Sequence, residues 1–327
     1  MRLILFGTGP FAVPTYRSLI NDHDVVAMVT RPIEDSGKRR KTAANPTRDL
    51  GEETGLQILD PKSCNDDAFV EQLKSIEADL FVVCDYGQIL SRDCLAAAKL
   101  GGINLHGSLL PAYRGAAPIQ WCVYNGDTVT GVTVIHMTAK LDGGPCIVTS
   151  KLDIDPHETA GDLEPRLSAL GPDAVAQAIG LLESWDGESV LGELQNRQAV
   201  TKAPRLKKSD GRIDFTRTAE QIVNQVRAFE PWPRSFTQWT PENKSELRLI
   251  LARVAVVGDA EITEAESISE SKPGSVALSD AQRLWIHTSN GLLSVIEIQP
   301  AGKKQMPIAD FLRGNQPKLG DTFGSTA

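Results

Sequence analysis

Short apolar runs alternate with stretches of helical periodicity along the first half of the chain. The runs that predict strands are residues 3–6, 25–30, 56–59, 80–84, 103–106 and 131–137. Apolar residues at three- and four-residue spacing predict helices at 13–20, 69–76, 163–170 and 174–183. The run 80–84 carries no charged residue, which is typical of a parallel strand buried on both faces. The alternation predicts an α/β, doubly wound, mostly parallel Rossmann-like sheet.

The pattern changes in the second half of the chain. Residues 187–204 are mixed, polar and weakly periodic, so we predict a linker there, between domains at 1–186 and 205–327. Thr218 and Gln221 have the spacing of a capping box and predict the start of a helix. Strands are then predicted at 247–257, 274–277, 284–288 and 292–298. Several short strands divided by turns favour a small β-barrel.

Polar residues that could take part in catalysis lie near two of the predicted strand ends. Asn104 and His106 are two residues apart, so on a strand their side chains project from the same face. A turn at 141–145 follows the strand 131–137 and can bring Asp142 back towards His106. A histidine at a strand end, or an aspartate before two glycines, is more often structural. These three residues alone therefore do not decide a function.

The first predicted strand leads into a glycine-containing loop. Gly7, Gly9 and Ala12 fit a loose form of the dinucleotide fingerprint, which leaves a nicotinamide-dependent oxidoreductase open. Pro10 removes one backbone N–H from any phosphate cradle. Arg31 follows the second strand where an NAD site has an acidic residue, so only NADP stays open.

Charge and cysteine content narrow the class of protein. Five cysteines without a C-x-x-C pair in 327 residues argue for a reducing, cytoplasmic compartment and against a zinc site. No apolar run reaches 18 residues, so we expect no membrane span. The net charge of −8 argues against nucleic acid. Basic residues nevertheless cluster at 38–41 and 197–217, and acidic ones at 259–270, so an RNA-binding module without activity is a further alternative.

One long stretch resembles a known family. INLHGSLLPAYRGAAPIQW, followed by TGVTVIHM and LDGGP, resembles the signature of the folate-dependent formyltransferases. The segments KAPRLKKSDGRIDF, VRAFEPWP and IQPAGKKQM extend the resemblance over nearly the whole chain, most closely to those that act on methionyl-tRNA. It implies formyl transfer from 10-formyltetrahydrofolate to the amino group of methionyl-initiator tRNA, with no metal, by a cytoplasmic monomer. It also implies that the C-terminal barrel is an OB-like tRNA-binding domain.

The same resemblance assigns expected roles to residues of this chain. Asn104, His106 and Asp142 are implied to be catalytic. The residues expected to contact the folate co-substrate are Ser108, Leu109, Leu110, Pro111, Asp85, Tyr86 and Gly87. Those expected to bind tRNA are Lys38, Arg39, Arg40, Lys41, Arg205, Lys207 and Lys208. The chain departs from the family pattern at Asp85, where alanine is usual, and at 143–145, where Gly-Gly-Pro replaces Thr-Gly-Asp. Enzymes acting on amino sugars or glycinamide ribotide share the first domain but not this second one.

The residues favour direct transfer over a covalent enzyme intermediate. Neither a Gly-x-Ser-x-Gly elbow nor a Cys/His nucleophile setting is visible in the sequence. His106 and the Asn104 amide can donate to a developing oxyanion. Asp142 beside His106 would favour the protonated ring and orient it, and could also accept the amine proton, directly or through water.

Overall fold

The computed structural model describes residues 1–33, 44–242, 245–262 and 272–324. Its contacts divide the chain into two compact units. The first comprises Met1–Ile119, Val129–Ile154 and Leu163–Arg205, and the second Gln120–Thr128, Asp155–Asp162 and Leu206–Ala327. Residues 187–204 fall within the first unit in this division. The domain limits expected from the sequence stay a prediction.

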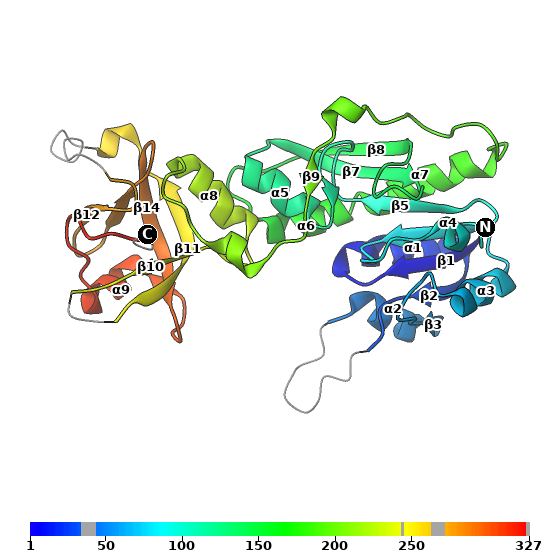
Figure 1. The fold of residues 1–327 in the computed structure, drawn as a ribbon, viewed down its shortest axis with the longest axis horizontal. Helices are drawn as coiled ribbons and strands as arrows, with labels where there is room; N and C mark the ends of the chain where they lie inside the picture. Colours follow the sequence, from blue (N-terminus) through cyan, green and yellow to red (C-terminus); the bar gives the residue numbers. More distant parts are fainter. Residues whose placement is uncertain (34–43, 243–244, 263–271, 325–327) are drawn as a thin grey trace. The chain divides into compact units, whose positions relative to one another are not determined.

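The first unit is built on a sheet with the strand order β3-β2-β1-β4-β5-β7-β8 (Figure 1). Its strands are β1 (Arg2–Gly7), β2 (Asp24–Val29), β3 (Gln57–Leu59), β4 (Leu80–Cys84), β5 (Gly102–His106), β7 (Val129–His136) and β8 (Cys146–Asp153). The strands from β3 to β5 pair in parallel, whereas β7 and β8 join antiparallel. The expected doubly wound, mostly parallel sheet is confirmed, and all of β4 is buried.

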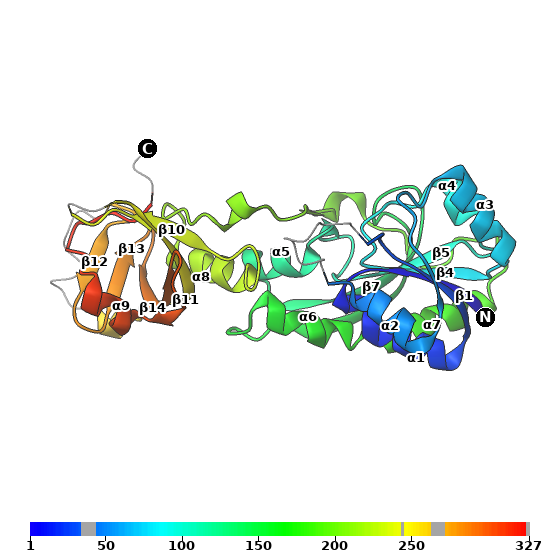
Figure 2. The same ribbon diagram turned by 90° about the horizontal axis from the view of Figure 1, so that it is seen from below.

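Helices cover both faces of this sheet. They are α1 (Val13–Asp22), α2 (Pro46–Thr54), α3 (Asp67–Ile76), α4 (Arg92–Leu95) and α7 (Gly171–Glu183). Figure 2 shows α3 and α4 on one face and α1, α2 and α7 on the opposite one. Phe69, Val70 and Leu73 of α3 pack with Phe6 and Phe81 of the sheet, as the helical spacing predicted. Helices α5 (Pro118–Asn125) and α6 (Ala160–Ser168) each have residues in both units.

Among the elements that differ from the sequence-based expectation are α2, β8 and α5. The polar loop expected at 31–48 ends earlier, because Pro46 is the first residue of α2 and Asn45 caps that helix by accepting from the Arg48 amide. Proline is favoured at the first helical position, where no N–H is needed. Strand β8 was missed because none of its residues is fully buried and its apolar residues do not form a continuous run or a regular alternation. Helix α5 was missed because apolar residues occur throughout its eight positions and leave no clear polar face.

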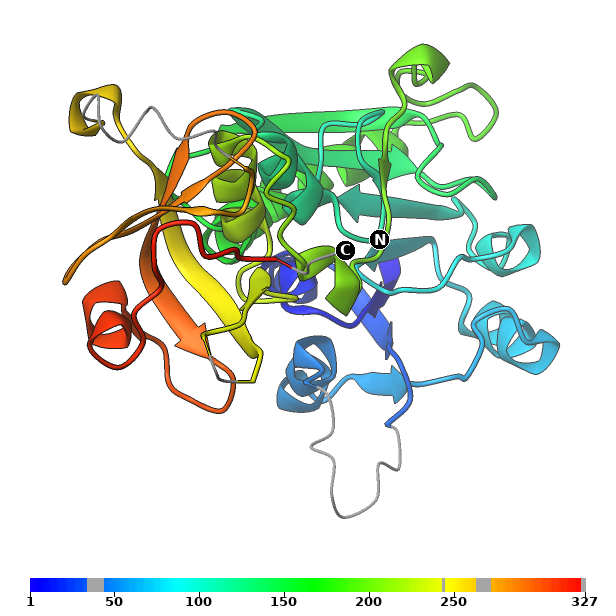
Figure 3. The ribbon, with the colours of Figure 1, turned by 60° about the vertical axis from the view of Figure 1, so that its left-hand side comes forward.

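The second unit is a curled antiparallel sheet. It contains β10 (Phe236–Trp239), β11 (Leu247–Val256), β14 (Leu292–Pro300), β13 (Leu284–His287) and β12 (Val276–Ser279) in that order, with β15 (Met306–Pro307) on β14. In Figure 3, β11 and β14 run side by side. Helices α8 (Ala219–Ala228) and α9 (Ile308–Gly314) contribute Ile222, Val226 and Phe311 to its core. The capping box at Thr218 and Gln221 is confirmed.

The C-terminal segment joins the two edges of this sheet. Phe323 bridges to Trp239 of β10, and Thr322 bridges to Ser275 just before β12. The Phe323 and Gly324 amides donate to the carbonyls of Gly274 and Gln238, at 2.7 and 2.8 Å. These bonds bring the open sheet towards the barrel that the strand pattern predicted.

Candidate active site

Asn104 and His106 lie on β5, between a parallel and an antiparallel neighbour. Asn104 pairs with Val83 of β4, and His106 pairs with Thr133 of β7. This is the position where the sheet changes from parallel to antiparallel pairing. Asn104 is half-buried and His106 is buried. His106 is the last residue of β5, and Asn104 lies two residues before it on the same strand.

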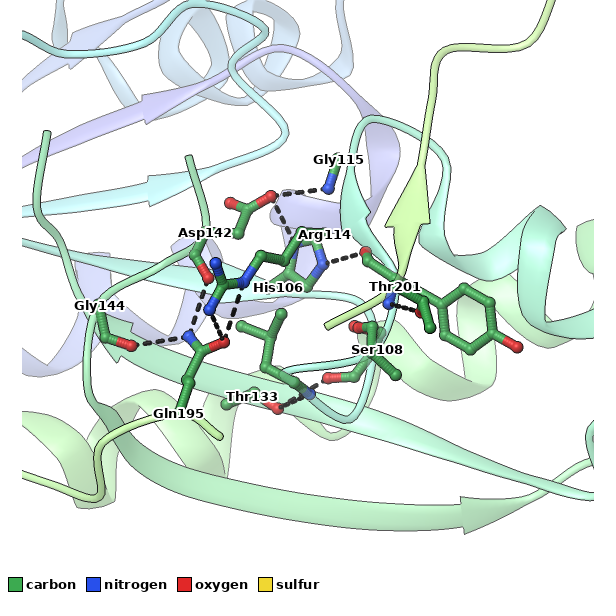
Figure 4. A network of polar contacts seen from close by, with 12 residues as sticks. His106, Ser108, Arg114, Gly115, Thr133, Asp142, Gly144, Gln195 and Thr201 are labelled. Atoms are coloured by element: carbon green, nitrogen blue, oxygen red, sulfur yellow. Dashed lines mark hydrogen bonds and ion pairs between the residues drawn. The ribbon is translucent and has the colours of Figure 1, made fainter. Parts of the chain in front are cut away.

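The His106 ring is held on one side by a backbone carbonyl. Its Nε2 lies 2.9 Å from the Tyr113 carbonyl oxygen, which can only accept, so Nε2–H donates this bond (Figure 4). The other ring nitrogen, Nδ1, lies 3.9 Å from Oδ2 of Asp142. The turn after β7 thus brings Asp142 to the free edge of His106. The separation is that of an ion pair and is too long for a direct hydrogen bond.

Asp142 has an unusual backbone conformation and a well-defined carboxyl position. Its φ of 46° is left-handed, which is uncommon for a residue other than glycine. Its side chain is 10 % exposed, and Oδ2 accepts a 2.8 Å hydrogen bond from the Gly115 amide. Only glycine fits at position 115 in this arrangement, because a Cβ there would lie 2.4 Å from the Ala203 carbonyl oxygen. A backbone amide therefore sets the direction of the carboxylate.

The Ser108–Pro111 segment is anchored to β7 by one buried hydroxyl. Thr133 Oγ1 donates to the Ser108 carbonyl at 2.7 Å and accepts from the Leu110 amide at 3.1 Å. The Ser108 hydroxyl donates to the Ala112 carbonyl at 2.7 Å, and the Leu110–Pro111 peptide is cis. The loop expected to contact folate is therefore a bonded turn next to His106.

The segment expected to be a linker supplies residues to this site that the sequence did not single out. Gln195 and Arg114 bond to each other beside Asp142, and Thr201 Oγ1 accepts from the Tyr113 amide at 2.8 Å. Strand β9 (Lys202–Ala203) pairs with β6 (Arg114–Gly115). Because the segment is polar and weakly periodic, no hydrophobic pattern could have indicated these contacts. Only the structure shows that Gln195 lies between two short stretches of backbone pairing, Cys146–Glu193 and β6–β9.

A second polar group lies at the ends of β1 and β4. Asp85 has a φ of 48° and is exposed, yet the surrounding protein desolvates its carboxyl and raises its pKa, while the charges of Arg31 and Arg205 oppose the rise. Burial also raises the pKa of Glu164, and the charge of Asp85 adds to that effect. Asp85 thus lies in an electrostatic setting shaped by Arg205, a residue expected to bind tRNA. Burial likewise raises the pKa of Tyr86.

The predicted tRNA-binding residues are only partly described. Arg205, Lys207 and Lys208 are exposed. Lys38, Arg39, Arg40 and Lys41 lie outside the described residues. Across the described ranges, His, Cys, Asp and Glu side chains form no group of three that could hold a metal ion. No helix in the same ranges is long and apolar enough to span a membrane.

Family models match both halves of the chain. Residues 1–179 match the model described as formyl transferase, and residues 205–316 match that of the formyl transferase C-terminal domain. The chain belongs to the formyl transferase family. The predicted resemblance is therefore confirmed, and a nicotinamide oxidoreductase and an RNA-binding module without activity are set aside.

Curated relatives match the chain over nearly its whole length. A methionyl-tRNA formyltransferase of Rhodopirellula baltica is 43% identical over 98% of this chain and 96% of its own length. One from Geobacter sulfurreducens is 36% identical over 99% and 97%. Among solved structures, a Helicobacter canadensis N-formyltransferase in complex with folinic acid and dTDP-3-aminofucose has a TM-score of 0.62 at 17% identity, covering 90% of this chain and 98% of that one. HypX from Aquifex aeolicus in complex with tetrahydrofolic acid has a TM-score of 0.58 at 14% identity, covering 100% and 50%. These two structures share the formyl transferase fold.

Proposed function

We propose that this formyl transferase moves the formyl group of 10-formyltetrahydrofolate to the free amino group of methionyl-initiator tRNA. The observation that carries the proposal is the full-length similarity to curated methionyl-tRNA formyltransferases, which includes the C-terminal unit. Relatives of that name take part in translation initiation, so we place the enzyme in the cytoplasm. We further propose that it acts as a monomer.

In this proposal the reaction is a direct transfer. The uncharged amine attacks the formyl carbon, and negative charge develops on the formyl oxygen. The attacking amine then loses a proton, the folate nitrogen takes one up, and the bond between the formyl carbon and that nitrogen breaks as the carbonyl re-forms. The Asn104 amide is a donor for that oxygen, and preorganised donors of this kind contribute about 2.7–4 kcal/mol each in well-studied enzymes. The half-buried position of Asn104 next to His106 supports this role.

His106 and Asp142 would act together at the same reacting centre. The Tyr113 carbonyl fixes Nε2 as a donor, so Nδ1 is the ring atom left for chemistry. Protonated Nδ1 can donate to the oxyanion, and neutral Nδ1 can accept the proton that the amine loses. The Asp142 carboxylate lies 3.9 Å from Nδ1 and orients the ring. The Ser108–Pro111 turn beside them is the proposed folate contact.

The function is tested by supplying 10-formyltetrahydrofolate with methionyl-initiator tRNA, free methionine, a dTDP-linked amino sugar or glycinamide ribotide. We expect formylation of the tRNA-bound methionine alone, scored by the labelled formyl group in acid-precipitable RNA and, for the three small acceptors, in the chromatographically separated product. Transfer to the sugar or the ribotide would overturn the assignment. His106→Ala and Asp142→Asn should nearly abolish transfer with unchanged circular dichroism, and Asn104→Ala should lower kcat with tRNA affinity unchanged.

A further inference from the structure

The Gln195 side chain links the turn at 142–144 to Arg114 of β6. Its Nε2 donates to the carbonyl oxygens of Asp142, at 2.8 Å, and Gly144, at 2.7 Å. Its Oε1 accepts from Nε and Nη2 of Arg114, at 3.0 and 2.6 Å. All four hydrogen-bonding positions of one amide are therefore used (Figure 4).

These bonds act on a backbone that would not hold its shape unaided. Asp142 has a left-handed φ of 46° and is followed by two glycines, Gly143 and Gly144, whose backbones are the most permissive in proteins. Such a conformation persists only where the surroundings determine it. The Gln195 amide donates hydrogen bonds to the carbonyls on both sides of Gly143, and the Gly115 amide donates one to the Asp142 carboxylate.

The segment that carries Gln195 is itself anchored on both sides. Before it, Glu193 and Cys146 exchange two backbone hydrogen bonds, each 2.8 Å long. After it, the Thr201 carbonyl accepts from the Arg114 amide at 2.9 Å, and β9 pairs with β6. Gln195 is thus presented to the turn from a fixed backbone, and Arg114 comes from the strand whose next residue, Gly115, holds Asp142.

We propose that Gln195 is a positioning residue for formyl transfer. Its amide holds the 142–144 turn in the conformation that directs the Asp142 carboxylate to Nδ1 of His106. The inference rests on the proposed function of Asp142. The carboxamide of glutamine can donate twice to carbonyls while its oxygen accepts from a guanidinium. Glutamate at this position would keep the Arg114 contact but lose both donated bonds.

The test compares Gln195→Met, Gln195→Glu and the control Gln198→Met. Methionine matches the length of glutamine without its hydrogen bonds, and Gln198 is an exposed glutamine of the same segment. We expect kcat to fall roughly 10–100-fold in both Gln195 variants, as for a misplaced catalytic group. KM for the folate and for the charged tRNA should stay within about twofold of wild type, because Gln195 acts through Asp142 and not through a substrate. Gln198→Met should retain wild-type kcat.

A spectroscopic measurement separates positioning from general loosening of the fold. The Gly115 amide proton reports directly on the Asp142 carboxylate, so its resonance should move in both Gln195 variants and stay in place in Gln198→Met. Equal unfolding midpoints of Gln195→Glu and wild type would show that the effect is local.

Several results would overturn the inference. An unchanged kcat and an unmoved Gly115 resonance in Gln195→Met would do so, as would a raised KM with normal kcat, which makes Gln195 a substrate contact. Full activity in Gln195→Glu would show that only the Arg114 contact matters. If wild-type protein formylates no acceptor, the proposed function fails, while the Gly115 resonance still decides whether Gln195 sets the position of Asp142.

Discussion

The Asp85 carboxyl rests directly against the backbone of Gly9. A Cβ added at residue 9 would lie 1.7 Å from Oδ2 of Asp85, so the two positions cannot both carry their side chains in this arrangement. The contact follows from the sheet, where Gly7 of β1 pairs with Cys84 of β4 and the next residues of both strands stay adjacent. The aspartate that departs from the family pattern thus fills the space that a side chain at residue 9 would occupy.

The first prediction concerns this pair. Gly9→Ala should destabilise the protein by about 1 kcal/mol, at the low end of the cost of overpacking, because the short Asp85 side chain can swing aside. In an Asp85→Gly background the same change should cost almost nothing, since glycine accepts a φ of 48° and leaves space. Urea unfolding of the four proteins measures the coupling. Equal costs of Gly9→Ala in both backgrounds would contradict the contact.

The second prediction concerns pH and stability. Desolvation holds the pKa of Asp85 above its ordinary value in spite of Arg31 and Arg205. The folded protein therefore binds the proton more tightly than the unfolded chain, so this group lowers stability as pH rises from about 4 through its raised pKa. Asp85→Asn removes that loss.

The unfolding midpoints of wild type and Asp85→Asn, measured between pH 3 and 8, test this sign. The unfolding midpoint of the variant should rise relative to that of the wild type as pH increases from about 4 through the raised pKa of Asp85. The difference should persist at neutral pH. Glu164→Gln should behave in the same direction, because the pKa of Glu164 is raised by burial and by Asp85. A constant difference across the pH range would remove Asp85 as the cause.

The sequence predicted the elements whose residues bury a regular pattern. The apolar run Leu80–Cys84 became the fully buried strand β4, and the capping box at Thr218 starts α8. The proximity of His106 and Asp142 was predictable, because Asn104 and His106 share one face of a strand and the turn at 141–145 can return Asp142 towards His106. Strand β10 was not readable, since its burial does not follow hydrophobicity: the polar Thr237 is buried together with Trp239, while Phe236 is only half-buried.

The remainder of the site depends on contacts between distant residues. Gln195 lies 53 residues from Asp142 along the chain, and Thr201 lies 88 residues from Tyr113. A polar side chain satisfies its hydrogen bonds in many ways, so sequence gives no preferred partner. The segment around Gln195 resembles a linker because it buries few apolar residues, although it is bonded to the site on both sides.

The third prediction concerns Thr133 under the Ser108–Pro111 turn. Thr133→Val keeps the shape of the side chain but leaves the Ser108 carbonyl and the Leu110 amide without their buried partner. Each unpaired buried group costs about 1–3 kcal/mol, so stability should fall and the turn should loosen. Folate affinity, measured by calorimetry, should weaken in Thr133→Val. Thr133→Ser keeps the hydroxyl and is the control; equal folate affinity in both variants would separate the turn from folate binding.

The fourth prediction concerns the basic residues after the linker. Lys207 and Lys208 are exposed, and the chain as a whole carries a net charge of −8, so binding to tRNA requires locally placed positive charge. Each lysine that binds a phosphate releases counterions when the complex forms. Changing both to glutamine should weaken tRNA binding at low salt. The slope of log affinity against log salt should also become shallower, by roughly 0.7–0.9 for each lysine–phosphate pair that the substitutions remove.

The matched control removes two exposed lysines from the other unit. Changing Lys74 and Lys99 to glutamine alters the net charge by the same amount. In the folded protein these lysines pair with Glu71 and Asp79. Filter binding of labelled initiator tRNA from about 50 to 200 mM salt gives both slopes, the range over which phosphate contacts show most clearly. If the two double variants show the same slope as each other, net charge alone governs binding. Only a slope that is shallower in the Lys207 and Lys208 variant assigns phosphate contacts to these lysines.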